Sequence, residues 1–335
     1  MPTLALFPGL DLPAEHTHSS GDLDLSVPHT AVVHNAHRTD FPADSLKLET
    51  RGTTSHLTQT ELFSRQMVYK SSVVAKLIEA GSPDIAEPLK ECHTSQGWAE
   101  CKGCKATRTF WNRCDRFYCP SCQPRLARER FESLEWWTKT ISQPKHVVLT
   151  VRNVDAISQQ YIRWLKSCRV RLIRRKIARN WKGGLWSMEV TNEGKGWHVH
   201  LHLLVNAQWI DNAELARQWA DLVGQDFAIV KVKDCRSADY LREVTKYAVK
   251  GSELAKWTGE QITHFVNAFT GGKNFGVFGE LYGKRTEWRE WIKSLGATKG
   301  LCECGCSEWE IYNADQWAMH KRYLCIVKSG IPPPD

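Results

Sequence analysis

The chain has 335 residues, of which 42% are hydrophobic, and a formal net charge of +8. This composition suits a soluble globular protein of one large or two modest domains, and no apolar run approaches the roughly 20 residues of a membrane helix. The first residues lack the basic start of a signal peptide, so we expect a cytoplasmic protein. The basic balance favours a polyanionic partner such as nucleic acid.

In chain order, composition divides the sequence into four segments. Residues 1–60 are polar and without periodicity, which predicts a flexible N-terminal segment. Residues 61–135 are expected to form a helical and zinc-knuckle module that binds DNA, beginning with one helix over 61–89. Residues 140–285 carry alternating strand and helix patterns and form the main domain. Residues 286–335 form a C-terminal segment.

Cysteines are dense in the second segment. The chain has twelve cysteines and shows no secretion signal, so metal binding is a better explanation for the cysteines than disulfide bonds. Cys101 and Cys104 form one Cys-x-x-Cys pair, and Cys119 and Cys122 form another. Four thiolates at this spacing predict one structural Zn²⁺ in a zinc-ribbon-like module, although Cys114 lies between the pairs and could replace one ligand. Free buried cysteines are the alternative.

A smaller cysteine group lies near the C-terminus. Cys302, Cys304 and Cys306 alternate along a short stretch, and His320 and Cys325 follow them. Thiolates and imidazoles are the usual ligands of zinc. The C-terminal segment is therefore a candidate for a second metal site, whose ligands this spacing alone does not fix.

The pattern from residue 146 onward alternates between apolar strands and amphipathic helices. It predicts, in order, a strand over 146–151, a helix over 155–180, strands over 185–190 and 197–205, a helix over 212–223, a strand over 227–233 and a helix over 237–250. This order is typical of a split βαβ unit, in which helices flank an antiparallel sheet. The fold class expected for the chain is therefore α+β, with a central antiparallel sheet.

Three histidines alternate along the predicted strand 197–205. Side chains two apart share one face of a strand, so His198, His200 and His202 lie together, opposite an apolar face. A hairpin with the preceding strand would bring Glu189 opposite Val199 or His200. Two imidazoles and one carboxylate suit a divalent Mg²⁺ or Mn²⁺ ion with open positions. We predict Glu189, His200 and His202 as ligands, with His198 adjacent or also ligating; histidines that only fill polar surface are the alternative.

The predicted helix over 237–250 carries a second chemical group. Glu243, Tyr247 and Lys250 lie at helical spacing along one face, with Lys246 beside them. Nearby lysines favour the anionic form of a phenol, and an activated tyrosine can act as a covalent nucleophile. An ordinary amphipathic helix could carry the same residue types, so the weight of this group comes from its place after a metal-binding sheet.

These motifs resemble those of the HUH endonucleases, a superfamily named for its histidine–hydrophobic–histidine motif. The chain looks most like plasmid rolling-circle replication initiators with one catalytic tyrosine and a nearby glutamate. Three stretches carry the resemblance, in the order of the family, and it spans residues 146 to about 279: His146–Asn153, Gly196–Leu204 and Glu243–Lys250. The family often has proline between its first two histidines, where this chain has Val199.

The resemblance implies the HUH nuclease fold and a site-specific endonuclease and strand transferase. Tyr247 would attack a phosphodiester of single-stranded or hairpin plasmid origin DNA, leaving a 5′-phosphotyrosine and a free 3′-hydroxyl primer. His200 and His202 would hold the catalytic metal, and Glu243 would activate a terminating water, with Lys246 and Lys250 beside the nucleophile. A host helicase and polymerase would be further partners.

Clusters of arginines predict where DNA phosphates are contacted. The candidates follow the first cysteine pair or lie in the predicted helix over 155–180: Arg113, Arg116, Arg125, Arg128, Arg174 and Arg175. Three other functions stay open from the sequence. They are an HUH-type transposase, a metal-dependent hydrolase that uses only the histidines, and a non-enzymatic zinc-ribbon regulator that binds DNA without cutting it.

Overall fold

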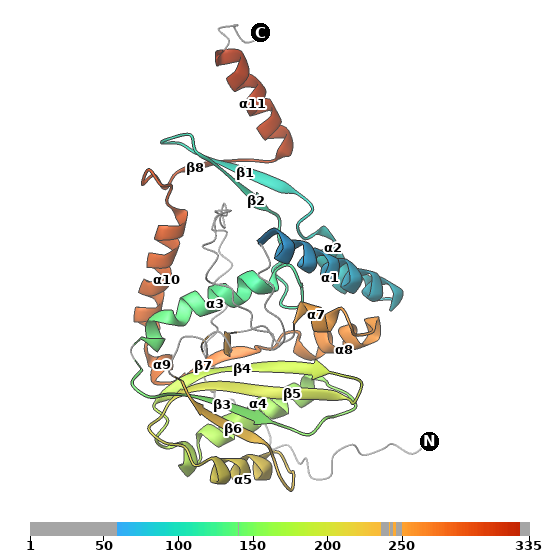
Figure 1. Cartoon of the computed structure of the whole chain (residues 1–335), viewed down its shortest axis with the longest axis vertical. Helices are drawn as coiled ribbons and strands as arrows, with labels where there is room; N and C mark the ends of the chain where they lie inside the picture. Colours follow the sequence, from blue (N-terminus) through green and yellow to red (C-terminus); the bar gives the residue numbers. More distant parts are fainter. Residues whose placement is uncertain (1–58, 140, 236–240, 242–243, 246–249, 329–335) are drawn as a thin grey trace.

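The structure is a computed structural model that describes residues 59–328 except 140, 236–240, 242–243 and 246–249. Residues 1–58 of the predicted N-terminal segment 1–60 therefore lie outside the described residues. The described chain contains a five-stranded and a three-stranded antiparallel sheet, together with helices that pack on both (Figure 1). The predicted α+β class with antiparallel sheets is confirmed. No helix in this part of the chain is long and apolar enough to cross a membrane.

The larger sheet has the strand order β6-β3-β5-β4-β7, with every neighbouring pair antiparallel. Its strands are β3 (Pro144–Thr150), β4 (Gly183–Asn192), β5 (Trp197–Asn206), β6 (Val230–Asp234) and β7 (Phe275–Gly279). Helix α4 (Gln159–Ile173) connects β3 to β4, and α5 (Asn212–Leu222) connects β5 to β6. This is the predicted split βαβ order, in which β5 lies between β3 and β4. The histidine strand is therefore the middle strand of the sheet.

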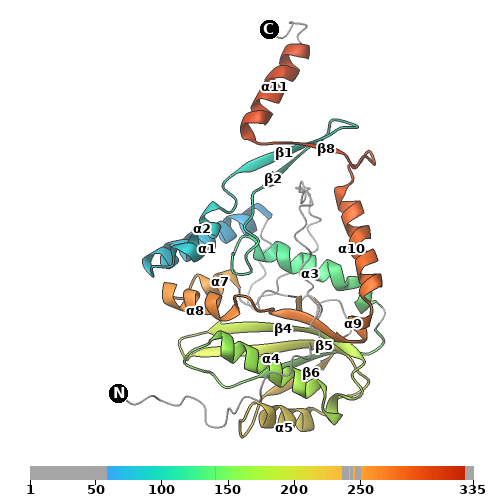
Figure 2. The ribbon, with the colours of Figure 1, turned by 180° about the vertical axis from the view of Figure 1, so that it is seen from behind.

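One face of this sheet is apolar and forms the main core. Val199, Leu201 and Leu203 of β5 are fully buried, as the alternation predicts. Helices α4 and α5 cover this face, and α4 contributes Ile162 and Leu165 (Figure 2). The predicted helix over 155–180 is shorter, because α4 ends at Ile173 and a short 3-10 helix, η2 (Lys176–Ala178), follows.

The opposite face of the sheet carries the histidines and is covered at one end. Leu185 and Leu204 share this face, since they pair with each other across β4 and β5. They pack against Leu134 and Trp137 of α3 (Gln123–Thr138). Helices α9 (Glu280–Gly283) and α10 (Arg285–Gly300) continue this layer, and the Trp291 indole of α10 donates to the Glu132 carbonyl of α3 at 2.6 Å.

The single helix predicted over 61–89 is wrong, because the structure has two helices there. Helix α1 (Gln59–Glu79) ends before Gly81, whose φ of +69° belongs to the left-handed region that favours glycine. Helix α2 (Pro83–Glu91) then begins with Pro83 in its first turn, where a proline costs no hydrogen bond. Helices α7 (Gly251–Leu254) and α8 (Gly259–Phe269) pack beside α1.

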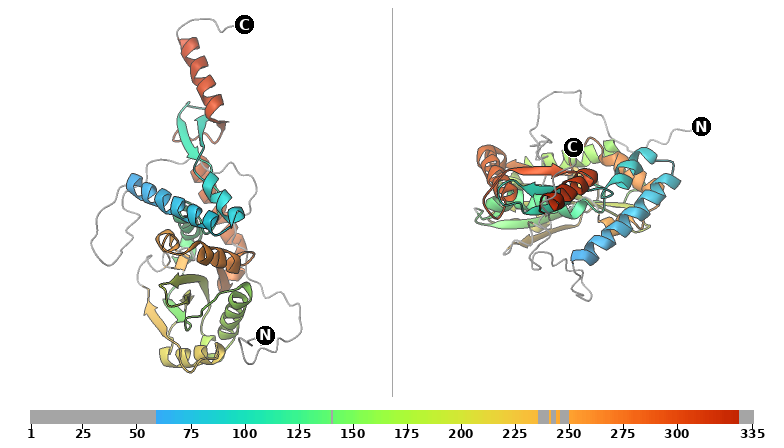
Figure 3. Two further views of the ribbon diagram at one scale, coloured as in Figure 1. Left: turned by 90° about the vertical axis from the view of Figure 1, so that its right-hand side faces the viewer. Right: turned by 90° about the horizontal axis from the view of Figure 1, so that it is seen from above.

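The smaller sheet has the order β2-β1-β8 and joins distant parts of the chain. Its strands are β1 (Gln96–Cys101), β2 (Thr107–Trp111) and β8 (Trp309–Tyr312). Helix α11 (Ala314–Lys328) packs on it through Trp317, which stacks on Trp98 with ring centroids 6.1 Å apart. This sheet and α11 extend away from the larger sheet, beyond the layer of α1 and α2 (Figure 3). The C-terminal segment therefore shares a sheet with the hairpin β1–β2.

Candidate functional site

The candidate site lies on the polar face of the larger sheet, where the register brings the predicted ligands together. Glu189 of β4 pairs with His200 of β5, and Ser187 pairs with His202. Directly opposed residues of antiparallel strands point to the same side, so these side chains share one face. The expectation that Glu189 lies opposite Val199 or His200 is confirmed for His200. We call the residues Glu189, His198, His200, His202 and His146 the histidine face.

Hydrogen bonds link three residues of this face in a row. His202 Nε2 lies 3.0 Å from Glu189 Oε2, and His202 Nδ1 lies 3.1 Å from His146 Nε2 of β3. The rings of His146 and His202 are nearly parallel, with an interplanar angle of 14°. His146 is not among the predicted site residues. The alternation rule applied to β3 would have found it, because an inner strand beside the histidine strand turns every second residue to the same face.

The geometry supplies two of the three predicted metal ligands in adjacent positions. Two ligand atoms bound at right angles to one ion at about 2.1 Å lie about 3.0 Å apart, which is the separation of His202 Nε2 and Glu189 Oε2. His200 does not complete the set. Within the described part of the chain, groups of three or more ligand atoms that all lie within 4.8 Å of one another consist of cysteines alone. The His200 ring lies closer to His198, at 4.0 Å between centroids.

Burial and neighbouring charges set the charge state of this face. Burial alone would raise the pKa of Glu189, but the hydrogen bond and charge of His202, with the charges of Lys250 and His200, lower that pKa to about 2. Burial lowers the pKa of His200 to about 4, with His198 adding to the effect. Burial also lowers the pKa of His198. At neutral pH the face therefore presents the anionic carboxylate of Glu189 beside the neutral imidazoles of His198 and His200, as a cation site requires.

The helix predicted to carry the nucleophile is described only in part. Tyr247, Glu243 and Lys246 lie outside the described residues. Leu241, Val244 and Thr245 are helical and buried, and the first two pack with Leu185 and Leu204 on the sheet face that carries the histidines. Lys250 is half-buried, and its charge helps lower the pKa of Glu189. On one side of residues 246–249, Leu241 and Val244 therefore pack on the sheet face that carries the histidines. On the other side, the charge of Lys250 acts on Glu189 of that face.

The predicted zinc site of Cys101, Cys104, Cys119 and Cys122 is wrong in its grouping. The structure divides these residues between two groups of four cysteines, each with all its Sγ atoms within 4.8 Å of one another. The first group is Cys92, Cys114, Cys119 and Cys122; the second is Cys101, Cys104, Cys302 and Cys304. The prediction failed because it paired motifs by their closeness in the chain, whereas folding brings in Cys92 from the end of α2 and Cys302 and Cys304 from the C-terminal segment.

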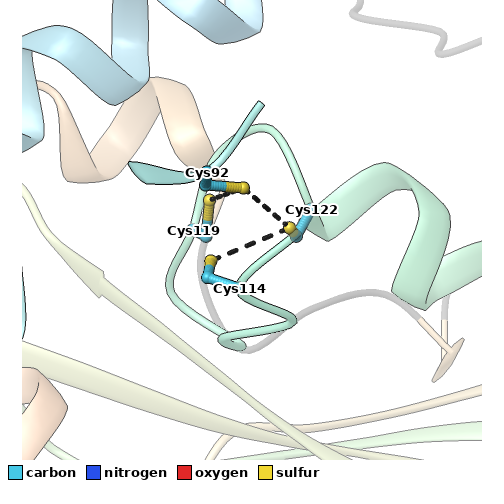
Figure 4. Close-up of side chains that lie close together, drawn as sticks. All are labelled: Cys92, Cys114, Cys119 and Cys122. Carbon is cyan, nitrogen blue, oxygen red and sulfur yellow. Dashed lines mark hydrogen bonds between the residues drawn. The ribbon is translucent and has the colours of Figure 1, made fainter. Parts of the chain in front are cut away.

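The first group has the dimensions of a tetrahedral metal centre (Figure 4). Cys92 Sγ and Cys122 Sγ lie 3.4 Å apart, Cys92 and Cys119 lie 3.8 Å apart, and Cys114 and Cys122 lie 3.9 Å apart. Four sulfurs bound tetrahedrally to one Zn²⁺ at about 2.3 Å lie about 3.8 Å from one another. This group could therefore hold a zinc ion, and Cys114, noted as an alternative ligand, belongs to it.

Donors and cations surround the first group. His93 Nδ1 lies 3.0 Å from Cys92 Sγ, and Ser121 Oγ lies 3.2 Å from Cys119 Sγ. The buried Lys70 ammonium of α1 donates to the Cys92 carbonyl at 2.6 Å. Contacts with the other thiols hold the pKa of Cys92 well below its ordinary value and raise that of Cys114. Without a cation the sulfurs compete for protons, so only a bound metal lets all four ionise.

The predicted phosphate-contacting arginines fall into two sets. Three of them pair with carboxylates: Arg125 with Asp115 and Glu129, Arg128 with Glu132, and Arg175 with Asp221. Arg116 and Arg174 are exposed, and Arg113 is half-buried. DNA contact by these six residues stays a prediction.

The chain was compared with protein-family models, curated proteins and solved structures, and none of them matches.

Proposed function

We propose that the protein is an HUH-type endonuclease that nicks single-stranded DNA through a covalent link to Tyr247, as the rolling-circle initiators that it resembles do. One observation carries the proposal. The contact between His202 and Glu189 lies on the same sheet face against which Leu241 and Val244 pack. This sheet has the split βαβ order, with the histidines on its middle strand. A nucleophile-bearing segment and a cation-binding pair on one face are what phosphodiester transesterification needs.

In the proposed reaction the phenolate oxygen of Tyr247 attacks a backbone phosphorus. A new oxygen–phosphorus bond forms as the bond to the 3′ oxygen breaks, and the leaving oxygen takes up a proton. The DNA on the 3′ side of the break stays on the protein through its 5′-phosphate, as a phosphotyrosine. The DNA on the 5′ side keeps a 3′-hydroxyl that is free to prime synthesis. Lys246 and Lys250 favour the phenolate, and Glu243 acts later as the base for a water that releases the DNA.

A divalent Mg²⁺ or Mn²⁺ ion held by Glu189, His200 and His202 would supply neutralisation of phosphate charge when bound. Glu189 and His202 already present adjacent ligand atoms, and their separation supports this part of the proposal. His146 would orient the His202 ring through its contact with Nδ1, the usual role of a residue behind a metal-bound histidine. Plasmid origin DNA, with a host helicase and polymerase as partners, completes the proposal.

The test uses a pool of single-stranded oligonucleotides with a randomised centre, incubated with the full chain and Mn²⁺. Denaturing gels then separate protein that carries DNA from free protein. We expect the wild type to form such an adduct. Tyr247→Phe should abolish it, because this change removes only the attacking oxygen. Tyr240 is the other tyrosine of the predicted helix over 237–250, so Tyr240→Phe is the matched control and should retain the adduct.

Changes on the histidine face should act on the same reaction. Glu189→Gln and His202→Ala should each lower the adduct yield by at least about 10- to 100-fold, because even residues that only support a metal ligand have effects of that size. An adduct that survives Tyr247→Phe would overturn the proposal. DNA binding without any cleavage by the wild type would favour the non-enzymatic regulator instead.

A further inference from the structure

The second cysteine group joins parts of the chain that are about two hundred residues apart in sequence. Cys101 ends β1 and Cys104 lies in the turn between β1 and β2, whereas Cys302 and Cys304 precede β8. Cys101 Sγ lies 3.7 Å from Cys304 Sγ, and Cys104 Sγ lies 3.4 Å from Cys302 Sγ. These separations are close to the about 3.8 Å between sulfurs that share a tetrahedral Zn²⁺.

Each cysteine pair is held by a tight hydrogen-bonded turn, which spans five residues at Cys101 and four residues at Cys302. Lys105 donates its amide to the Cys101 carbonyl at 2.9 Å, and Gly305 donates to the Cys302 carbonyl at 2.8 Å. Lys105 has a φ of +61° and Gly305 a φ of +84°, so each turn reverses directly after its second cysteine. The two turns contribute two thiols each and form a four-thiolate site from separate segments.

The contacts around this group are otherwise slight. Lys102 pairs with Glu308 at 3.3 Å, with both side chains more than half exposed, and Arg108 donates to the Leu301 carbonyl at 3.0 Å. Exposed ion pairs of this kind stabilise a structure by at most about 1 kcal/mol. Strand β8 has four residues and pairs only with β1 in the described sheet. A two-stranded hairpin is only marginally stable, so a metal that holds β8 and α11 on the β1–β2 hairpin would add stability to this small sheet.

We propose that Cys101, Cys104, Cys302 and Cys304 bind a Zn²⁺ ion that clamps the C-terminal segment onto the β1–β2 hairpin, separately from a zinc ion at the first group. Cys104 and Cys304 are exposed, whereas three cysteines of the first group are buried in the main core. The clamp therefore exchanges its metal faster than the first group does. This inference does not depend on the DNA-nicking proposal, because metal content and exchange are measured without DNA.

The first test is the zinc content of the purified full chain by elemental analysis. We expect two zinc ions per chain in the wild type and one in Cys302→Ser/Cys304→Ser. Cys92→Ser/Cys119→Ser should lose the other ion if it stays folded. Cys306→Ser is the matched control and should keep both, because Cys306 lies outside the group and its Sγ accepts the Glu308 amide. One zinc in the wild type, or two in Cys302→Ser/Cys304→Ser, would overturn the proposal.

The second test asks whether the metal acts as a clamp. Hydrogen–deuterium exchange of the full chain should show faster exchange in β8 for Cys302→Ser/Cys304→Ser than for the wild type or Cys306→Ser, with exchange in β5 unchanged. Equal protection of β8 in all three proteins would reject the clamp. Replacement by Co²⁺ gives a reading that does not rely on those variants, since tetrahedral thiolate ligation produces strong visible absorption. If the visible absorption of the Co²⁺-substituted wild type corresponds to only one bound ion per chain, the proposal of two sites would also be contradicted.

Discussion

At the scale of residues, the histidine face combines burial with polar chemistry. His202 is 8% exposed and His146 6% exposed, yet both ring nitrogens of His202 have a hydrogen-bonding partner. Buried polar groups are tolerated when they are paired in this way. Glu189 gains its low pKa from the same contact. The row of Glu189, His202 and His146 therefore supplies hydrogen-bonding partners for buried polar groups. It also keeps the Glu189 carboxylate anionic, as cation binding requires.

His200 should make the metal-free protein sensitive to acid. Burial lowers its pKa from 6.5 to about 4 in the folded state. Between these values the unfolded chain binds more protons, so the free energy of unfolding falls as the pH drops from about 6.5 towards 4. The loss from this residue should be below about 1.4 kcal/mol per pH unit, because the ring is partly exposed. His200→Gln should remove it.

Urea unfolding at pH 7 and pH 5, without added Mg²⁺ or Mn²⁺, measures this effect. His264→Gln is the matched control, since His264 is exposed on α8 and should leave the pH dependence as in the wild type. Equal loss of stability between the two pH values in wild type and His200→Gln would contradict the burial argument.

At the scale of elements, close contacts fix how the helices meet. Gly259 begins α8 directly after Thr258, whose side chain accepts from the Gln261 amide in a capping box. A Cβ at Gly259 would lie 1.9 Å from the Lys76 carbonyl oxygen of α1. Glycine is therefore required where α8 crosses α1, and the Lys76 ammonium reinforces the contact by donating to the Trp257 carbonyl at 2.9 Å.

Gly259→Ala should separate α1 from α8. We expect a loss in the free energy of unfolding of about 1–3 kcal/mol, the usual cost of overpacking, because backbone rather than a flexible side chain must move. Gly283→Ala is the matched control, since a Cβ there meets nothing within 4 Å, and it should change stability by less than about 0.5 kcal/mol. Urea denaturation compares the two variants. Equal stability of Gly259→Ala and the wild type would show that this helix contact is looser than described.

At the scale of the whole molecule, local patterns predicted the sheet better than the metal centres. Alternation of residue types is a property of each strand, so it identified β5 and its apolar back face. The predicted hairpin placed Glu189 opposite Val199 or His200, and the structure selects His200. The helix break at Gly81 was not predicted, because the apolar pattern on both sides also fits one helix. Gly81 followed by Pro83 is the sequence signal that marks the break. The cysteine groups could not be predicted from spacing, since Cys302 and Cys304 join Cys101 and Cys104 only through the pairing of β8 with β1.

The most direct test of the central claim is to locate the covalent bond between protein and DNA. The full chain is incubated with single-stranded DNA and Mn²⁺, digested with a nuclease and a protease, and its peptides are analysed by mass spectrometry. We predict one modified peptide, with a nucleotide joined through phosphate to Tyr247. Modification of Tyr240 or another residue, or cleavage of the DNA without any modified peptide, would contradict the proposed function.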